Sequence, residues 1–296
     1  MFKQLLERST TPPMKRRLLR VFHGGIASIV RFRVLTGQLG PLPDFVVIGA
    51  QKGGTTYMYN ELVRHPNVAA ALTKEVHFFD DNYRKGEATY RAYFPASLGE
   101  RPSNGASRKI TGEASPDYLF HPQAPRRLAR MVPQAKLIAL LRNPVSRAYS
   151  HYHHEVRLGF ETQSFEAAII SEAERVRGER ERMLRDEYYP GNKYMHYSYL
   201  GRGIYADQLQ AWLEWFPRQQ MLILKSEDFY KDTPAIMGQV LDFLGLPARA
   251  SEGYTAHMPS SYPKLNPAMK AHLSDYFVGH NRRLYDLLGV DFGWGG

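Results

Sequence analysis

Residues 45–66 combine a short apolar run, a glycine loop and a helical pattern, and this combination constrains the fold more than any other segment. The apolar run FVVIGA (45–50) is rich in β-branched residues and follows turn residues, which is typical of a buried strand. The loop QKGGTT (51–56) leads into TYMYNELVRHP, whose apolar spacing predicts a helix that ends near Pro66. A strand, a glycine loop and a helix in this order begin a βαβ unit.

Later apolar runs continue this pattern along the chain. The further expected strands are VAAAL (68–72), KITGEA (109–114), KLIALL (136–141) and MLILK (221–225). Helical patterns separate several of them, at PRRLARMV (125–132), VSRAYSHYHHEVR (145–157), SFEAAIISEAERVR (164–177), YADQLQAWLEWF (205–216) and PAIMGQVLDFLG (234–245). This alternation predicts a single α/β domain with a central parallel sheet flanked by helices and a P-loop-like phosphate-binding loop. Ligands of such sheets bind beyond the carboxyl ends of the strands.

The length and composition fit one large domain. The chain has 296 residues, and we expect a basic N-terminal segment at 1–36 and a domain at 37–296. The formal net charge of +10 suits a nucleic acid, an anionic membrane face or a polyanionic glycan as partner, although a scattered surface excess explains it equally well. The sequence has no cysteine, which excludes disulfides and thiolate metal ligands.

Residues 14–36 mix Lys and Arg with Leu, Val, Ile and Phe. Such a segment suits an anionic membrane surface, but a basic helix that packs its apolar stripe on the domain is the more ordinary alternative. The pair Gly24-Gly25 is expected to interrupt either helix. The N-terminus lacks a signal-peptide core, and no run approaches the roughly 18 apolar residues of a membrane span. We expect a cytoplasmic protein, with peripheral membrane contact through 14–36 as an open alternative.

The glycine loop has the properties of a phosphate site. Backbone N–H groups at a helix start, together with the helix dipole, attract anions. The loop and the first helical turn offer small residues, hydroxyls and one lysine, at Gln51, Lys52, Gly53, Gly54, Thr55 and Thr56. In a nucleoside-triphosphate P-loop the lysine follows the glycines, whereas Lys52 precedes them. A phosphorylated ligand without an obvious Mg²⁺ carboxylate is therefore expected, with a simple glycine turn as the alternative.

A second anion site is expected where KLIALL ends. Arg142 follows this run, Asn143 can cap the next helix, and Pro144 fits its first position. Ser150 lies about two turns into that helix, near enough to share an anion with Arg142. A capped helix with an exposed arginine is the simpler alternative, but it does not explain the pairing with the first loop.

These motifs together resemble those of the PAPS-dependent sulfotransferase family, in particular the branch that contains the heparan sulfate sulfotransferases. The matching segments are QKGGTT (51–56), Lys74-Glu75-Val76-His77-Phe78-Phe79, RNPVSRAYSHY (142–152), Gly203–Pro217, Ser226-Glu227-Asp228 and FLGLP (243–247). They span most of the chain in a compatible order. The family often has a lysine in an E-K-[ST]-P segment, whereas this chain reads Glu113-Ala114-Ser115-Pro116, so the departure concerns the acceptor and not the donor.

The resemblance implies where the donor PAPS binds. The first loop would hold its 5′-phosphosulfate, and Arg142 and Ser150 would hold its 3′-phosphate. Arg202 and Gly203 are expected at the 3′-phosphate or the adenine, and Lys264 is expected to close over the nucleotide from the C-terminal loop.

The resemblance also implies an in-line transfer of a sulfuryl group from PAPS to a hydroxyl or amine, with release of PAP. Lys52 is expected to stabilise the charge that develops on the leaving nucleotide. Glu75 is the first choice as general base, because a hydroxyl acceptor must lose its proton. His77 shares a face with Glu75 if the segment is extended, and it is the rival base. The alternative to a catalytic role is that Glu75 only pairs with Lys74 or another cation.

Other functions explain the sequence less completely. A P-loop-type kinase needs the lysine after the glycines and a metal-binding aspartate, and a nucleic-acid-binding module needs a recognition helix or an aromatic RNA motif. We therefore expect a sulfotransferase that acts on a glycan, a lipid or a small molecule, without a metal and without nucleic acid. His151 and His154 have helical spacing, but no ligand set accompanies them, and both are expected on the helix surface or in the acceptor cleft.

Overall fold

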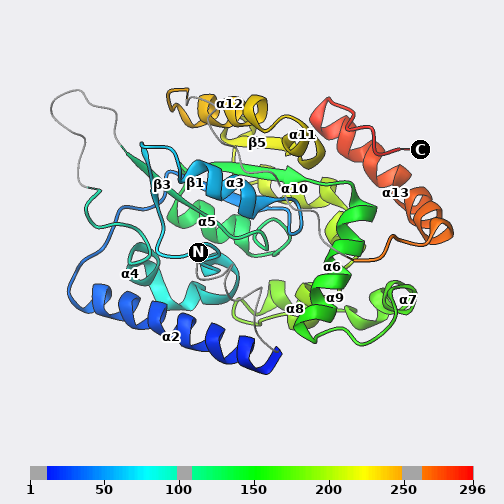
Figure 1. Ribbon diagram of the computed structural model, residues 1–296, viewed down its shortest axis with the longest axis horizontal. Coiled ribbons are helices and arrows are strands. Elements are labelled where there is room, and N and C mark those ends of the chain that lie inside the picture. The colour runs from blue at the N-terminus through cyan, green and yellow to red at the C-terminus, as the bar shows by residue number, and fades with distance from the viewer. Residues whose placement is uncertain (1–11, 99–108, 249–261, 296) are drawn as a thin grey trace.

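Five parallel strands form the centre of the molecule, in the order β2-β3-β1-β4-β5 (Figure 1). The computed structural model describes residues 12–98, 109–248 and 262–295, with side chains from residue 24 onward. The strands are β1 Phe45–Gly49, β2 Val68–Ala70, β3 Ile110–Ala114, β4 Lys136–Leu141 and β5 Met221–Lys225. Each strand lies within a run that the sequence predicts as a strand, and the predicted parallel sheet is confirmed.

Helices connect these strands and surround the sheet. The α-helices of the described ranges are α2 Pro12–Leu35, α3 Thr55–Leu62, α4 Gly86–Arg91, α5 Ala124–Met131, α6 Pro144–Leu158, α7 Phe165–Arg175, α8 Glu179–Arg185, α9 Asn192–Tyr197, α10 Tyr205–Leu213, α11 Ser226–Lys231, α12 Thr233–Leu244 and α13 Pro267–Leu288. Short turns of other helix types lie at Phe78–Asn82 (η1), Tyr83–Lys85 (η2), Gly201–Gly203 (η3) and Arg218–Gln220 (η4). The predicted cap of α6 is present, since the Ser146 N–H donates to Asn143 Oδ1 at 3.1 Å.

The central strand β1 is buried along its whole length, and its side chains pack against helices on both faces of the sheet. Val46 and Ile48 belong to one hydrophobic cluster, together with residues of α5, α10 and α13. Phe45 and Val47 belong to a second cluster, together with residues of α3 and α12. Because side chains alternate across a strand, a strand covered on both sides must be apolar at every position, and FVVIG meets this requirement.

The strand order reverses beside β1. The chain forms β2 and β3 on one side of β1, and then β4 and β5 on the other side. In open parallel sheets, such a reversal leaves a crevice outside the carboxyl ends of the strands, where ligands bind. β1 and β4 are direct neighbours, with Val47 opposite Ile138. The segments that follow these two strands, at residues 50–54 and at Arg142, therefore emerge side by side at this edge.

The N-terminal helix α2 runs without a break through Gly24 and Gly25, so the predicted interruption at this pair is wrong. Each glycine costs an exposed helix only about 1 kcal/mol relative to alanine. The C-terminal half of α2 is held beside α4, because Val30 is buried and Arg33 Nη1 donates to the Ala92 carbonyl at 3.0 Å (Figure 1). Within the described ranges, no helix is long and apolar enough to cross a membrane.

Candidate active site

Residues 50–54, here called the phosphate loop, form a tight turn between β1 and α3. The Ala50 N–H donates to the Leu140 carbonyl at 2.9 Å, and the Gly53 N–H donates back to the Ala50 carbonyl at 2.8 Å. Lys52 and Gly54 have left-handed backbones, with φ of 69° and 101°. Gly54 immediately precedes α3, whose first amides have no partner within the helix. The turn therefore brings backbone N–H groups and one lysine to a helix N-terminus, which is the arrangement of an anion site.

Close packing explains both glycines of the phosphate loop. A Cβ on Gly53 would lie 2.3 Å from the Leu140 carbonyl oxygen, and a Cβ on Gly54 would lie 2.5 Å from Tyr230 Oη. The Ser226 hydroxyl also donates to the Gly53 carbonyl at 2.7 Å. The loop is thus pressed between β4 and α11, and only residues without a side chain fit at these two positions.

The second predicted anion site lies directly against the phosphate loop. Arg142, at the end of β4, donates from Nη1 to the Lys52 carbonyl at 3.2 Å. The Tyr205 hydroxyl donates to the Arg142 carbonyl at 2.8 Å and fixes the backbone there. Ser150 lies on α6 and is buried. The structure therefore brings the lysine and the arginine of the two predicted sites together, as the strand order requires.

The surroundings of Lys52 contain charges of both signs. Burial, together with the cations Arg157 and Arg142, lowers the pKa of Lys52 to about 8, whereas Glu75 and Glu155 act in the opposite direction. These groups come from β4, α6 and the segment after β2, so three parts of the chain face the same space as the lysine. A bound anion at this position would compensate the excess of positive charge.

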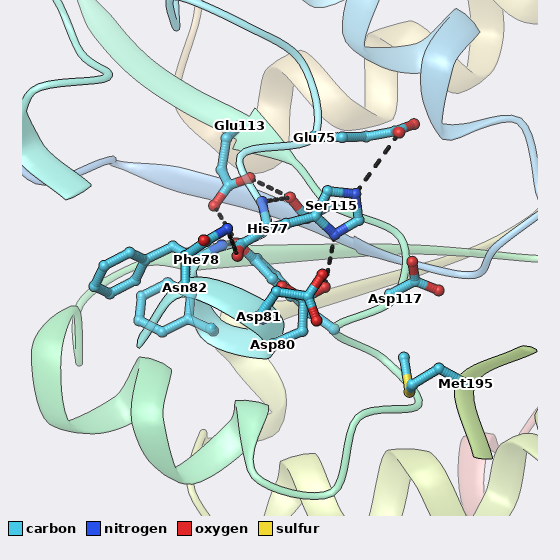
Figure 2. Close-up of polar contacts among 12 residues, drawn as sticks. Glu75, His77, Phe78, Asp80, Asp81, Asn82, Glu113, Ser115, Asp117 and Met195 are labelled. Atoms are coloured by element: carbon cyan, nitrogen blue, oxygen red, sulfur yellow. Dashed lines mark hydrogen bonds and ion pairs between the residues drawn. The ribbon is translucent and has the colours of Figure 1, made fainter. Parts of the chain in front are cut away.

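The segment after β2 is not extended, which was the condition for Glu75 and His77 to share a face by alternation. Glu75 and His77 both have left-handed backbones, with φ of 63° and 50°, and His77 leads directly into η1. The two side chains still meet, since His77 Nε2 lies 3.8 Å from Glu75 Oε2 (Figure 2). Glu75 also pairs with Lys74 Nζ, as the non-catalytic alternative predicts.

Asp80 completes this group and was not predicted as a site residue. His77 Nδ1 lies 2.7 Å from Asp80 Oδ2, and the Asp80 side chain is only 2% exposed (Figure 2). Burial by itself lowers the pKa of His77, but the Asp80 and Glu75 carboxylates outweigh burial and raise that pKa well above its usual value. The result is a carboxylate–imidazole–carboxylate chain. The signal in the sequence was an aspartate three residues after His77, which becomes a neighbour only if the chain turns there.

Arg202 is held by contacts within the protein. Its guanidinium is almost fully buried and donates from Nη1 to Asp117 Oδ1 at 2.7 Å and from Nη2 to the Met195 carbonyl at 2.8 Å. A buried guanidinium needs a carboxylate to offset its desolvation, and Asp117 supplies one. Gly203 is buried, and a Cβ there would lie 2.8 Å from the Phe277 ring. These contacts give both residues a part in packing, and their contact with the nucleotide remains a prediction.

Two members of the carboxylate–imidazole–carboxylate chain, together with Asp117, have the donor atoms of a metal site. The ligand atoms of His77, Asp80 and Asp117 all lie within 4.8 Å of one another. Asp117 is paired with Arg202 and Asp80 with His77, so each carboxylate already has a cationic partner within the protein. Charge compensation at this cluster therefore comes from side chains.

The C-terminal loop that carries Lys264 packs on α6. The Tyr262 ring stacks on His153, with ring centroids 4.6 Å apart and an angle of 11° between the planes. Leu265 packs against the cluster that contains Val145. Lys264 is exposed between these two anchors, above the helix that carries Ser150. A role of Lys264 in closing over the nucleotide remains a prediction.

The histidines of α6 differ from one another in exposure. His151 is fully buried, so the prediction that it lies on the surface or in the cleft is wrong. Burial and the nearby cations Arg202 and Arg147 lower its pKa well below the usual value. His151 Nε2 lies 3.2 Å from Glu155 Oε1. His154 is half-buried and contacts Arg157 at 2.9 Å, and its pKa responds to Lys52, which places it on the cleft side.

The fold and the site together define a class of protein. A phosphate loop lies at the strand reversal, two cations face it, and a carboxylate–imidazole pair lies near the lysine. Such a site has the groups that an enzyme of group transfer from a nucleotide requires, namely an anion site for a phosphorylated donor and a base near it. The sulfotransferase domain model matches residues 42–283, and the chain belongs to this sulfotransferase family.

Individual relatives agree with this assignment. Heparan sulfate glucosamine 3-O-sulfotransferase 6 from Homo sapiens is 31% identical, over 86% of this chain and 74% of its own length. The membrane-associated sulfotransferase kil1 from Dictyostelium discoideum is 27% identical, over 87% of this chain and 68% of its own length. A solved sulfotransferase from Alicyclobacillus acidocaldarius is 28% identical, with a TM-score of 0.64 over 86% of this chain and 99% of that one. The chain is a PAPS-dependent sulfotransferase, and the kinase alternative is not favoured.

Proposed function

We propose that this sulfotransferase transfers the sulfuryl group of PAPS to a hydroxyl group of a glycan. The contact between Arg142 and the Lys52 carbonyl carries the proposal, because it joins two anion sites at one edge of the sheet. The phosphate loop would hold the 5′-phosphosulfate, and Arg142, Ser150 and Lys264 would surround the 3′-phosphate. The glycan acceptor is supported by the human relative, which is named a heparan sulfate glucosamine 3-O-sulfotransferase.

The proposed step is an in-line displacement at sulfur. The acceptor oxygen forms a bond to sulfur while the bond between sulfur and the bridging phosphate oxygen breaks, and the electron pair of that bond stays on PAP. Protonated Lys52 stabilises the charge that develops on the bridging oxygen. The acceptor proton goes to a general base on the other side of the sulfuryl group.

Between the two candidate bases, we propose Glu75. His77 has a pKa well above its usual value because of Asp80 and Glu75, so its imidazole is protonated near neutral pH and cannot accept a further proton. A cationic His77 beside Glu75 keeps the carboxylate ionised and ready to accept the acceptor proton. Asp80 Oδ2 accepts a hydrogen bond from the other ring nitrogen, Nδ1, and so orients the imidazole.

Binding of PAP tests the donor site separately from the chemistry. We expect Arg142→Ala and Lys52→Ala to weaken PAP binding by about tenfold or more, because each removes a charged contact with a phosphate. Glu75→Gln is expected to bind PAP like the wild type and to lose turnover by about a hundredfold or more. Thermal stabilisation by PAP and turnover of labelled PAPS with glycan acceptors measure the two effects. Tight binding of ATP with Mg²⁺, together with no binding of PAP, would contradict the proposal.

We also propose that α2 rests on an anionic membrane surface. Ile29, Phe32 and Leu35 are 42%, 57% and 75% exposed and follow one another at intervals of three along the helix. The sequence of α2 contains Lys15, Arg16, Arg17, Arg20, Arg31 and Arg33 and no acidic residue. An apolar stripe on a basic helix suits the interface of an anionic bilayer. The name of the membrane-associated relative from Dictyostelium discoideum is consistent with such a location.

A further inference from the structure

Glu113 is a buried carboxyl group next to residues 75–78, here called the catalytic segment, and it has no part in the chemistry described so far. It is on β3 and fully buried, and three hydroxyl groups surround it, of which Figure 2 labels that of Ser115. Tyr90 and Tyr118 donate to Glu113 Oε1 at 3.0 Å and 2.8 Å, and Ser115 donates to Oε2 at 2.6 Å. Burial raises the pKa of Glu113, and these hydroxyl bonds act against that rise.

Two of the three hydroxyls also contact the backbone of the catalytic segment. The His77 N–H donates to Ser115 Oγ at 3.0 Å, and the Phe78 N–H donates to Tyr118 Oη at 2.7 Å (Figure 2). An amide N–H can only donate, and a hydroxyl has a single proton. Ser115 and Tyr118 therefore accept from the backbone and turn their protons toward Glu113. Each forms a relay from the buried carboxyl group to one main-chain amide.

These relays end at a strained position. His77 has a left-handed backbone, and such a conformation costs a residue other than glycine about 1 kcal/mol or more, so its surroundings must hold it. The amides of residues 77 and 78 lie on either side of the His77 α-carbon. Fixing both amides fixes the direction in which the imidazole leaves the backbone, between Glu75 and Asp80.

We propose that Glu113 is a positioning residue for the catalytic segment, acting through Ser115 and Tyr118 on the backbone of His77 and Phe78. Tyr90 is the internal control of this arrangement. Its hydroxyl donates to the same carboxyl oxygen as that of Tyr118 but contacts no amide of the catalytic segment in the bonds described. The inference rests on the proposed role of Glu75 and His77 in proton removal.

Paired variants test the relay. Tyr118→Phe and Tyr90→Phe each remove one buried hydroxyl that donates to Glu113, so both are expected to lower the melting temperature to a similar extent. Only Tyr118→Phe frees a backbone amide of the catalytic segment. We expect kcat to fall by about 10–100-fold in Tyr118→Phe and to stay within about twofold in Tyr90→Phe, because small displacements of a catalytic group cost that much. The KM for PAPS and PAP-induced stabilisation should remain at wild-type values in both.

A second variant keeps the inference testable if one tyrosine variant folds poorly. Glu113→Gln preserves the shape of the side chain but replaces one carboxyl oxygen with an NH₂ donor. In either orientation of the amide, the hydroxyl of Ser115 or that of Tyr118 loses its acceptor, so kcat should fall as in Tyr118→Phe while PAP still binds. Equal kcat in the two tyrosine variants, or a change in KM for PAPS instead of kcat, would overturn the relay. Full turnover in Glu75→Gln would instead refute the proposed base, so the two failures are distinguishable.

Discussion

At the scale of single residues, the meeting of Lys52 and Arg142 was predictable and the surroundings of His77 were not. Lys52 and Arg142 are recognisable because each follows a predicted strand, and neighbouring parallel strands bring their ends together. Asp80 was not predicted as a site residue, because its contact with His77 depends on the turn at η1, and the alternation of side chains does not predict that turn. The burial of Arg202 against Asp117 was not predicted, since a glycine-rich segment gives no sign of it.

The lowered pKa of Lys52 has a measurable consequence. The lysine carries its charge below about pH 8 and loses it above, so kcat/KM for PAPS should fall about tenfold per pH unit beyond that point. A profile of kcat/KM from about pH 6 to about pH 10 measures this decrease, which is the alkaline limb of the profile.

Lys52→Arg is the control for that assignment, because a guanidinium keeps its charge throughout this range. The variant is expected to be less active but to lack the alkaline limb. The same limb in wild type and variant would assign it to a group other than Lys52.

At the scale of elements, strand positions were predicted well because a strand covered on both faces must be continuously apolar. The segments between the strands were predicted less well. The break expected in α2 at Gly24 is absent, since contacts of Val30 and Arg33 outweigh the weak helix propensity of glycine. The left-handed residues Glu75 and His77 are held by contacts with β3, which are distant in sequence.

The close approach of the phosphate loop to β4 predicts the effect of a single methyl group. In Gly53→Ala the new Cβ would overlap the Leu140 carbonyl, so we expect about 1–3 kcal/mol of lost stability and weaker PAP binding. Gly238→Ala, in α12, is the matched control, because no atom lies within 4 Å of its new Cβ. The control should be as stable as the wild type or more so, with unchanged PAP affinity.

Urea unfolding and PAP titration measure both variants. Wild-type PAP affinity in Gly53→Ala would show that the loop tolerates displacement and would remove the steric argument for glycine at this position.

At the scale of the whole molecule, α2 lies along one side of the domain, next to α4, while the catalytic edge is formed by other segments (Figure 1). The sequence predicted a basic segment there and could not decide between packing and membrane contact. The structure contains a packed side, with Val30, and an exposed side, with Phe32 and Leu35. The packing alternative therefore applies to one face of the helix, and the exposed face is the one that we propose for membrane contact.

Vesicle sedimentation tests the exposed side. The double variant Phe32→Glu/Leu35→Glu should bind vesicles that contain an anionic phospholipid at least about tenfold more weakly than the wild type, because apolar contact is lost and repulsion is added. Ile170→Glu on α7 is the control, since this residue is also an exposed apolar side chain, at 80%. Wild-type binding should weaken with added salt. Equal vesicle binding by the double variant and the control would refute the membrane proposal.

The order in which the strands contribute to the site has an evolutionary consequence. The phosphate loop follows β1 and Arg142 follows β4, whereas the catalytic segment follows β2 and Ser115 and Asp117 follow β3. The parts proposed to hold the donor and the parts proposed to face the acceptor thus lie on opposite sides of one strand boundary. Apart from the catalytic residues themselves, substitutions after β2 and β3 are therefore expected to change the acceptor more than the nucleotide, so descendants of one ancestral fold would acquire new acceptors while they keep the same sulfate donor.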